Sequence, residues 1–242
     1  MVCWVAERAL AARNVDRVII ATDSNEVANV VRAEGYETVL TADNHTSGTD
    51  RVAEVAAAIL DAEIIVNLQG DEPLISSDTI ERVVDQMHLE MTRSDGAGIV
   101  TTWEPIESFD DIISSDLVKV VVGEHDQAIY FSRSPIPCPR DLLKKHGSSE
   151  AACANEPDFL KLFRKHTGLY VYQRNVLLEF TRWPQTQLER IESLEQLRAL
   201  EHGVVIRVIE ASSASIGVDT AEDLKRVRTL ISEGKIEASA VR

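Results

Sequence analysis

A short apolar segment that runs directly into a polar turn sets the expected fold class of this chain. Residues 64–68 read Ile-Ile-Val-Asn-Leu, and Gly70, Asp71 and Pro73 follow almost at once. Consecutive apolar positions of this kind predict a strand buried on both faces, as in a parallel sheet covered by helices. The glycine and proline predict a turn, so Asp71 should lie just beyond the carboxyl end of the strand, where open α/β sheets bind ligands. Asp71 is therefore either a ligand for a divalent metal that faces a phosphate or, equally, a residue that hydrogen-bonds its own turn.

Strand and helix patterns alternate along the first half of the chain. Residues 15–23 repeat the pattern of a buried strand that ends at a carboxylate, and residues 24–33 have helical spacing up to Gly35. Further strands are expected at 36–40 and 98–102, and further helices at 52–60 and 79–91. These units predict an α/β layered sheet with helices on both faces.

The pattern changes after residue 115. Two apolar runs separated by the five residues 123–127 predict a β-hairpin. An irregular polar segment, a strand and a helix are expected in turn at 137–161, 168–172 and 188–201. We therefore expect one domain, residues 1–242, with an inserted β-rich region at 119–175.

Composition limits the possible partners and compartment. The formal net charge of −15 argues against binding to nucleic acid or to an anionic membrane, because both would repel the chain. No apolar run approaches the roughly 20 residues that span a bilayer, and no signal peptide is evident at the start. Three scattered cysteines without a C-x-x-C pair suit a reducing cytoplasm. The sequence also contains no P-loop, no nucleophile elbow and no glycine-rich dinucleotide motif.

Two aspartates and one polar turn are candidates for binding a phosphorylated ligand. Asp219, like Asp71, follows a glycine at the end of a strand-like segment, and two such carboxylates could share one Mg²⁺. Asp219 could instead simply precede a capped helix. The turn at 45–51 offers hydroxyl groups, a glycine and a helix N-terminus, which suit either a nucleotide or an ordinary N-cap.

Other polar residues in the second half are candidates for binding an acidic ligand. Arg133, His166 and Tyr170 could donate hydrogen bonds to an acidic sugar, although each is also a common surface or internally paired residue. The helix expected at 188–201 carries opposite charges three and four residues apart, which is typical of a solvated face.

Seven segments in order resemble the CMP-Kdo synthetase family, the 3-deoxy-manno-octulosonate cytidylyltransferases. They are HTSGTDR (45–51), IVNLQGDEP (65–73), LVKVVV (117–122), IYFSRSPIP (129–137), KHTGLYVY (165–172), LERIESLEQLRALEHG (188–203) and GVDTAEDL (217–224). The resemblance implies a nucleotide-diphospho-sugar transferase-like fold and a homodimer whose inserted β region forms the contact. It also implies a cytoplasmic enzyme that joins CTP and Kdo into CMP-Kdo, releases pyrophosphate and supplies lipopolysaccharide synthesis.

The same resemblance assigns roles to individual residues. Asp71 and Asp219 match the family's catalytic Mg²⁺ carboxylates. The residues that match its substrate-binding segments are Gln69, Arg51, Arg133, His166, Tyr170, Glu192 and Gln196. Another acidic sugar of the sialic acid type is an alternative substrate, and a non-catalytic dimerising or sugar-binding remnant is an alternative from a different class.

The chain departs from the family pattern at its start. Family members begin with an apolar strand and a cationic loop of pattern Arg-x-x-Ser-x-Arg, whereas residues 1–9 here align with the helix that follows. Without that strand two neighbouring strands should keep unpaired edges, and without the loop the triphosphate should lose a cationic partner. We therefore expect this chain to be less active and less stable than an N-terminally extended version, which a rate comparison of the two would test.

Overall fold

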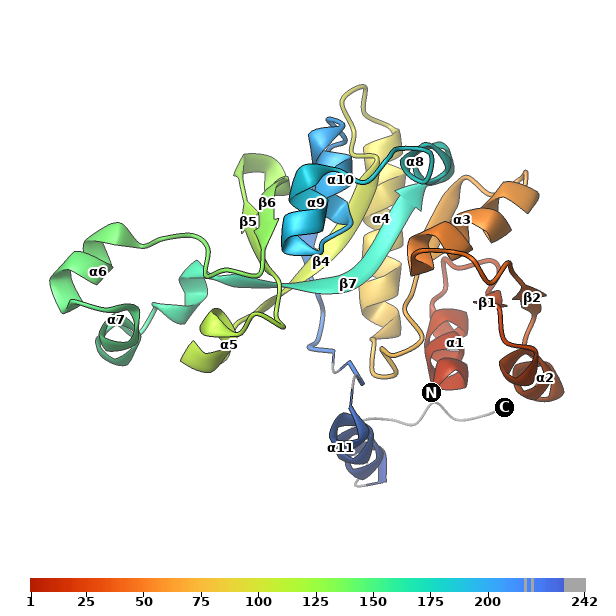
Figure 1. The fold of residues 1–242 in the computed structure, drawn as a ribbon, viewed down its shortest axis with the longest axis horizontal. Coiled ribbons are helices and arrows are strands. Elements are labelled where there is room, and N and C mark those ends of the chain that lie inside the picture. The colour runs from red at the N-terminus through yellow and green to blue at the C-terminus, as the bar shows by residue number, and fades with distance from the viewer. Residues whose placement is uncertain (216, 219, 233–242) are drawn as a thin grey trace.

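Neighbouring residues of the central strands point into two different apolar cores, and this alternation produces the layers of the fold. In strand β4 (Ile99–Pro105) Ile99 packs in one core and Val100 in the other, and in β7 (Arg164–Gln173) Tyr172 and Val171 divide in the same way. Helices on the two faces complete the two cores (Figure 1). The computed structural model describes residues 1–215, 217, 218 and 220–232, and it has the expected α/β layers with helices on both faces.

The strands form one large mixed sheet and one small parallel pair. The remaining strands are β1 (Ile20–Thr22), β2 (Thr38–Leu40), β3 (Ile64–Asn67), β5 (Lys119–Val122), β6 (Ala128–Ser132) and β8 (Ile206–Glu210). The six-stranded sheet has the order β6-β5-β7-β4-β8, with β3 added beside β7, and β1 pairs with β2 separately. Strand β7 is antiparallel to β3, β4 and β5, whereas β4 and β8 are parallel.

Helices α4 and α1 cover one face of the large sheet, and α3, α8 and α10 cover the other. The α-helices of the first half are α1 (Val2–Ala11), α2 (Asn25–Ala33), α3 (Gly48–Ala58), α4 (Ser77–Met91) and α5 (Phe109–Ile113). Those of the second half are α6 (Arg140–His146), α7 (Ser149–Asn155), α8 (Arg174–Phe180), α9 (Gln187–Glu192), α10 (Gln196–Glu201) and α11 (Ala221–Ser232). Short 3₁₀ helices occur at Glu124–Asp126 and Leu160–Leu162. No helix in the described part of the chain is long and apolar enough to cross a membrane.

Strand β3 differs from its sequence interpretation. It forms, but its only partner among the described strands is the antiparallel β7, and only Asn67 of its four residues is fully buried. The expectation of a strand buried on both faces of a parallel sheet was wrong because β3 lies at an edge of the described sheet and pairs there with an antiparallel strand. Among the described strands, β1 pairs with β2 alone, so β1 and β3 each have one edge without a partner strand there.

Two segments of the second half also correct the sequence expectations. Residues 137–161, expected to be irregular, form helices α6 and α7, which extend away from the central sheet (Figure 1). The single helix expected at 188–201 is broken into α9 and α10 by Ser193, whose φ of +54° lies in the left-handed region. The hairpin of β5 and β6, with its loop at 123–127, is confirmed. Strand β7 lies within the predicted insertion at 119–175 but is part of the central sheet. The boundaries of that insertion therefore stay a prediction.

A buried ion pair ties helix α4 to the sheet. Glu90 is fully buried and accepts two hydrogen bonds from the Arg207 guanidinium of β8, both at 2.9 Å. It also accepts the backbone N–H of Ala97 at 2.8 Å and the amide of Gln86 at 2.7 Å. Burial by itself would raise the pKa of Glu90, but these hydrogen bonds outweigh it and lower the pKa to about 2.

We expect this pair to make stability depend on pH in the acid range. A carboxylate whose pKa is lowered on folding stabilises the protein above its unfolded pKa, and the stabilisation is lost as the pH falls toward about 2. At pH 7, Glu90→Gln should lower the free energy of unfolding by about 3 kcal/mol, measured by urea denaturation. Near pH 3 the difference from the parent protein should shrink, and an equal loss at both pH values would contradict this origin.

Candidate active site

The register of β7 brings the end of β3 and the middle of β4 to one place in the sheet. Tyr170 lies opposite Asn67 of β3 on one side and opposite Thr101 of β4 on the other. The side chain of Gln69, just beyond β3, donates to the Asn67 side-chain oxygen at 3.3 Å. The end of β3 and the candidate ligand residue Tyr170 therefore belong to one site.

The polar turn at 45–51 lies beside this site. Its Gly48 leaves room for Gln69, since a Cβ atom at Gly48 would come within 3.2 Å of the Gln69 amide oxygen. Ser47 accepts the backbone N–H of Asp50 at 3.2 Å, so it is the N-cap of α3. Gln69 thus lies at the N-terminus of α3, where backbone N–H groups favour an anion.

Arg51 joins the loops that follow β1 and β2. Its guanidinium donates to the hydroxyl of Thr41 at 2.6 Å and to the carboxylate of Asp23 at 2.9 Å. The side chain is therefore engaged within the protein, and it links the loops that follow β1 and β2 to α3.

The two candidate metal ligands lie in segments that contact each other. The backbone N–H of Val218 donates to the Asp71 carbonyl oxygen at 2.8 Å, which brings the residue preceding Asp219 next to Asp71. Asp219 itself lies outside the described residues. The Asp71 side chain is exposed and has no hydrogen-bond partner in the described part of the chain, so its carboxylate is available to a ligand. Convergence of the two carboxylates stays a prediction.

Glu72 and Glu104 are site residues that sequence reasoning missed. Ser215 connects them, because its hydroxyl donates to Glu72 at 2.5 Å and its backbone N–H donates to Glu104 at 2.8 Å. Burial raises the pKa of Glu72, the Ser215 hydrogen bond opposes the rise, and nearby Asp71 and Glu104 add to it. Lys165 lies 2.7 Å from Glu104 and partly balances this acidic group. Little in the sequence indicated either residue, since Glu72 directly follows Asp71 and Glu104 is a single carboxylate near the end of β4.

Arg133 and Glu192 form the second half of the site. The Glu192 carboxylate accepts the hydroxyl of Ser132 at 2.7 Å and the backbone N–H of Arg133 at 3.0 Å. The Arg133 side chain in turn donates from Nε to the Glu192 carbonyl oxygen at 2.9 Å. Glu192 is thus used within the protein to hold Arg133, and the sequence interpretation of a solvated charged face does not describe it.

His166 presents a hydrogen-bond acceptor. Its ring packs against Phe131 and Tyr170, with centroid distances of 5.0 and 5.3 Å, and burial lowers its pKa to about 3. The hydroxyl of Thr101 lies 2.7 Å from the Leu169 carbonyl oxygen, which can only accept, and 2.9 Å from His166 Nε2. Nε2 must therefore carry the proton and donate to Thr101. Nδ1 is left as an acceptor without a partner among the described residues, which differs from the donor role expected from the sequence.

Tyr170 and Gln196 complete the set of candidate residues. Burial raises the pKa of Tyr170 well above its usual value, so its hydroxyl stays protonated and is able to donate. Gln196 is buried at the start of α10, whose Leu197 shares an apolar core with Phe131 and Tyr170. Both side chains therefore lie on the same side of the sheet as Phe131.

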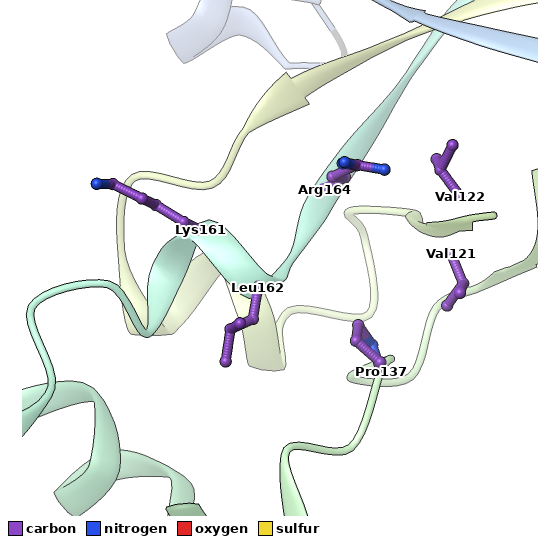
Figure 2. Close-up of a pocket in the computed structure, with 6 residues that line it drawn as sticks. All are labelled: Val121, Val122, Pro137, Lys161, Leu162 and Arg164. Atoms are coloured by element: carbon purple, nitrogen blue, oxygen red, sulfur yellow. The ribbon is translucent and has the colours of Figure 1, made fainter. Parts of the chain in front are cut away.

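A pocket of about 270 Å³ lies elsewhere, between β5 and the segment that leads into β7 (Figure 2). It is lined by Val121, Val122, Pro137, Lys161, Leu162 and Arg164. Arg164 also stacks over the ring of Trp103 at 4.7 Å. No carboxylate and none of the candidate residues line this pocket, so we do not assign it to the site.

The donors near Asp71 suit a hard cation better than a transition metal. No group of three or more histidine, cysteine, aspartate or glutamate side chains within the described residues is arranged to hold a metal. Mg²⁺ needs fewer protein ligands, because it keeps waters and takes phosphate oxygens beside one or two carboxylates. The accessible carboxylate of Asp71 fits that requirement.

Comparisons with known proteins agree on one family. The family described as Cytidylyltransferase matches residues 1–209. A 3-deoxy-manno-octulosonate cytidylyltransferase of Trichlorobacter lovleyi is 43% identical over 97% of this chain and 89% of the relative. One from Geobacter metallireducens is 45% identical over 98% of this chain and 89% of the relative. A solved structure of CMP:2-keto-3-deoxy-manno-octonic acid synthetase complexed with CTP superimposes with a TM-score of 0.82, at 35% identity, and covers 96% of this chain and 88% of that one.

We expect His166 to remain a neutral Nε2–H imidazole throughout the neutral range. Because its pKa lies near 3, ¹⁵N NMR of histidine-labelled protein should show no titration of His166 between pH 5 and 9. Thr101→Val removes the acceptor of the Nε2 proton, so the ¹⁵N shifts of that variant should move toward a mixture of tautomers. A His166 signal in the parent protein that titrates near pH 6.5 would contradict the assignment.

Proposed function

The chain belongs to the cytidylyltransferase family and, within it, to the 3-deoxy-manno-octulosonate cytidylyltransferases, and from that premise we propose that it joins CTP and Kdo into CMP-Kdo. One observation carries the proposal within the molecule. Strand β7 brings the end of β3, with Gln69 and Asp71 beyond it, beside Tyr170 and His166. A phosphate-side group and a sugar-side group thus share one sheet, as a transfer between a nucleotide and a sugar requires.

The proposed reaction is an in-line displacement at the α-phosphorus of CTP. The oxygen of the Kdo anomeric hydroxyl forms the new bond to phosphorus, and its O–H bond breaks with transfer of the proton to water. The bond from the α-phosphorus to the bridging oxygen breaks, and pyrophosphate leaves with that electron pair. In the proposed reaction Gln69 and the N-terminus of α3, which lie beside each other, orient the nucleotide, and Arg51 holds the adjoining loops.

Asp71 and Asp219 are the residues that would hold the proposed Mg²⁺. The bound ion supplies positive charge that offsets the charge on the phosphate oxygens and acidifies a nearby hydroxyl. Val218 and Asp71 are joined by a backbone hydrogen bond, which supports this pairing. Glu72 would add negative charge beside Asp71, because the two carboxylates interact electrostatically and Glu72 is held by the Ser215 hydroxyl.

The sugar side uses residues with separate tasks. The Arg133 guanidinium is a cation for the carboxylate of the sugar, and Glu192 fixes its orientation. His166 Nδ1 would accept a hydrogen bond from a sugar hydroxyl, and Tyr170 would donate one. Gln196 lies on the same side and would add an amide contact.

We also propose that the chain works as a homodimer in the cytoplasm and supplies lipopolysaccharide synthesis. Three large apolar side chains in or near the inserted region are exposed, namely Ile113 (54%), Ile129 (58%) and Leu162 (43%). These exposed apolar side chains are the candidate residues for the contact between two copies of the chain.

Pyrophosphate release tests the proposed activity. With CTP and Mg²⁺, both this chain and an N-terminally extended version should release pyrophosphate at least about tenfold faster with Kdo than with N-acetylneuraminate. Asp71→Asn and Asp219→Asn should each lower the rate by about 10³-fold without changing the circular dichroism spectrum. Faster release with N-acetylneuraminate would assign the other acidic sugar, and Kdo binding by calorimetry without any release would favour the non-catalytic alternative.

The proposed dimer contact predicts a change in mass. Ile129→Asp places a charge on the exposed face of β6, so sedimentation velocity should show a shift from dimer to monomer. Leu60→Asp is the matched control, because Leu60 is 83% exposed but lies outside the inserted region. An Ile129→Asp protein that remains dimeric would remove this face from the contact.

A further inference from the structure

Lys119 is a fully buried cation whose environment neither the sequence motifs nor the proposed reaction accounts for. The residue is 0% exposed in strand β5, where it lies opposite Ser132 and Lys165. Its Nζ donates to the carbonyl oxygens of Ser114 and Leu117, both at 2.7 Å, and to that of Arg133. A neutral amine has only two N–H groups, so three carbonyl acceptors require the charged ammonium.

The same loop also holds Arg133. One guanidinium nitrogen of Arg133, Nη1, donates to the carbonyl oxygens of Ser115 at 2.9 Å and Asp116 at 3.4 Å. Residues 114–117 therefore present carbonyl oxygens to two cations, Lys119 and Arg133. Because Lys119 also binds the Arg133 carbonyl, it fixes both the loop and the backbone at the end of β6.

Neither cation is neutralised by an ion pair in the described part of the chain. The side-chain hydrogen bonds of both go to carbonyl oxygens, which are neutral. Carbonyl dipoles satisfy the N–H groups but leave the net charge of each cation in place. Glu192 is the nearby anion, and its hydrogen bonds come from neutral donors, the Ser132 hydroxyl and the Arg133 backbone, so its charge also stays in place. Its one negative charge offsets one of the two positive charges and leaves a net positive charge.

A fully buried cation, Lys119, beside a second, half-buried one, Arg133, is costly unless something uses their charge. Burial and then the Arg133 charge lower the pKa of Lys119, while Glu192 raises it. Elsewhere the chain pairs its buried cations with carboxylates, as for Arg207 with Glu90 and Arg198 with Glu189. Within the described residues, the end of β6 thus carries cations without an ion pair in a chain whose net charge is −15.

We propose that Lys119 is a positioning residue that holds Arg133 and adds a second positive charge to the binding site for the carboxylate of the acidic sugar. This inference rests on the proposed function and names a residue that the reaction has not so far used. Lys119 is fully buried, so it touches no substrate atom itself. It acts by holding Arg133 and the 114–117 loop and through the electric field of its ammonium charge.

Comparing the parent protein with Lys119→Met, each with the charged sugar and with its uncharged carboxamide, separates this role from a purely structural one. In Lys119→Met, calorimetry should show about tenfold weaker binding of Kdo, while the affinity for CTP changes less than about twofold. With the uncharged carboxamide of the same sugar, the parent protein and the variant should bind equally. Lys161→Met is the matched control, since it removes the same charge from a side chain that is 78% exposed, and it should leave both affinities unchanged.

Several outcomes would overturn the inference. They are unchanged Kdo binding in Lys119→Met, an equal loss for Kdo and its carboxamide, or a loss of CTP affinity. A parent protein that binds no Kdo would instead refute the proposed function.

A measurement on the parent protein covers the case in which Lys119→Met does not fold. In lysine-labelled protein, the ¹⁵Nζ signal of Lys119 should shift on addition of Kdo and remain in place on addition of the carboxamide. If neither ligand shifts that signal in a protein that binds Kdo, the inference is wrong.

Discussion

The pairing of β7 with three other strands is the interaction on which the rest of the structure depends. Its amino-terminal end lies beside β5, its whole length lies beside β4, and its carboxyl-terminal half lies beside β3. A register shift between Thr101 and Thr102 leaves Gly168 and Leu169 without partners in β4, so β7 bends there. The bend lets the buried Thr101 hydroxyl reach both the Leu169 carbonyl and His166. It therefore sets the tautomer of the His166 ring, one of the candidate substrate-binding residues.

Charge is distributed in this molecule in a way that suits two anionic substrates. The chain as a whole repels anions, so a binding site must create local positive potential. On the proposed nucleotide side, Arg51 is paired with Asp23, and the N-terminus of α3 contributes dipoles. On the proposed sugar side, Lys119 and Arg133 are held by neutral carbonyls. One half of the site therefore relies on helix dipoles and a paired arginine, whereas the other relies on two cations whose hydrogen bonds go to backbone carbonyl oxygens.

The sequence predicted local features well and long-range ones poorly. The β5–β6 hairpin and the end of α2 before Gly35 follow from turn chemistry, and the structure confirms both. The antiparallel direction of β7 relative to β3 could not be predicted, because strand direction depends on the path of the chain rather than on local pattern.

The site residues show the same limit. Resemblance pointed to Arg133 and Glu192 but not to their mutual contact, which joins residues 59 apart in the chain. Lys119, inside an apolar run, looks like an ordinary exposed position of a strand, and only the fold shows that it is buried. The break at Ser193 separates two helices and has its own consequence. In an unbroken helix the Glu192 carbonyl oxygen would be consumed by the N–H group four residues later, whereas the interruption turns it outward as an acceptor for Arg133 Nε. A substitution that restored helical continuity there would displace the Arg133 guanidinium, because it would redirect the backbone carbonyl oxygens of Glu192 and Ser193 that hold it.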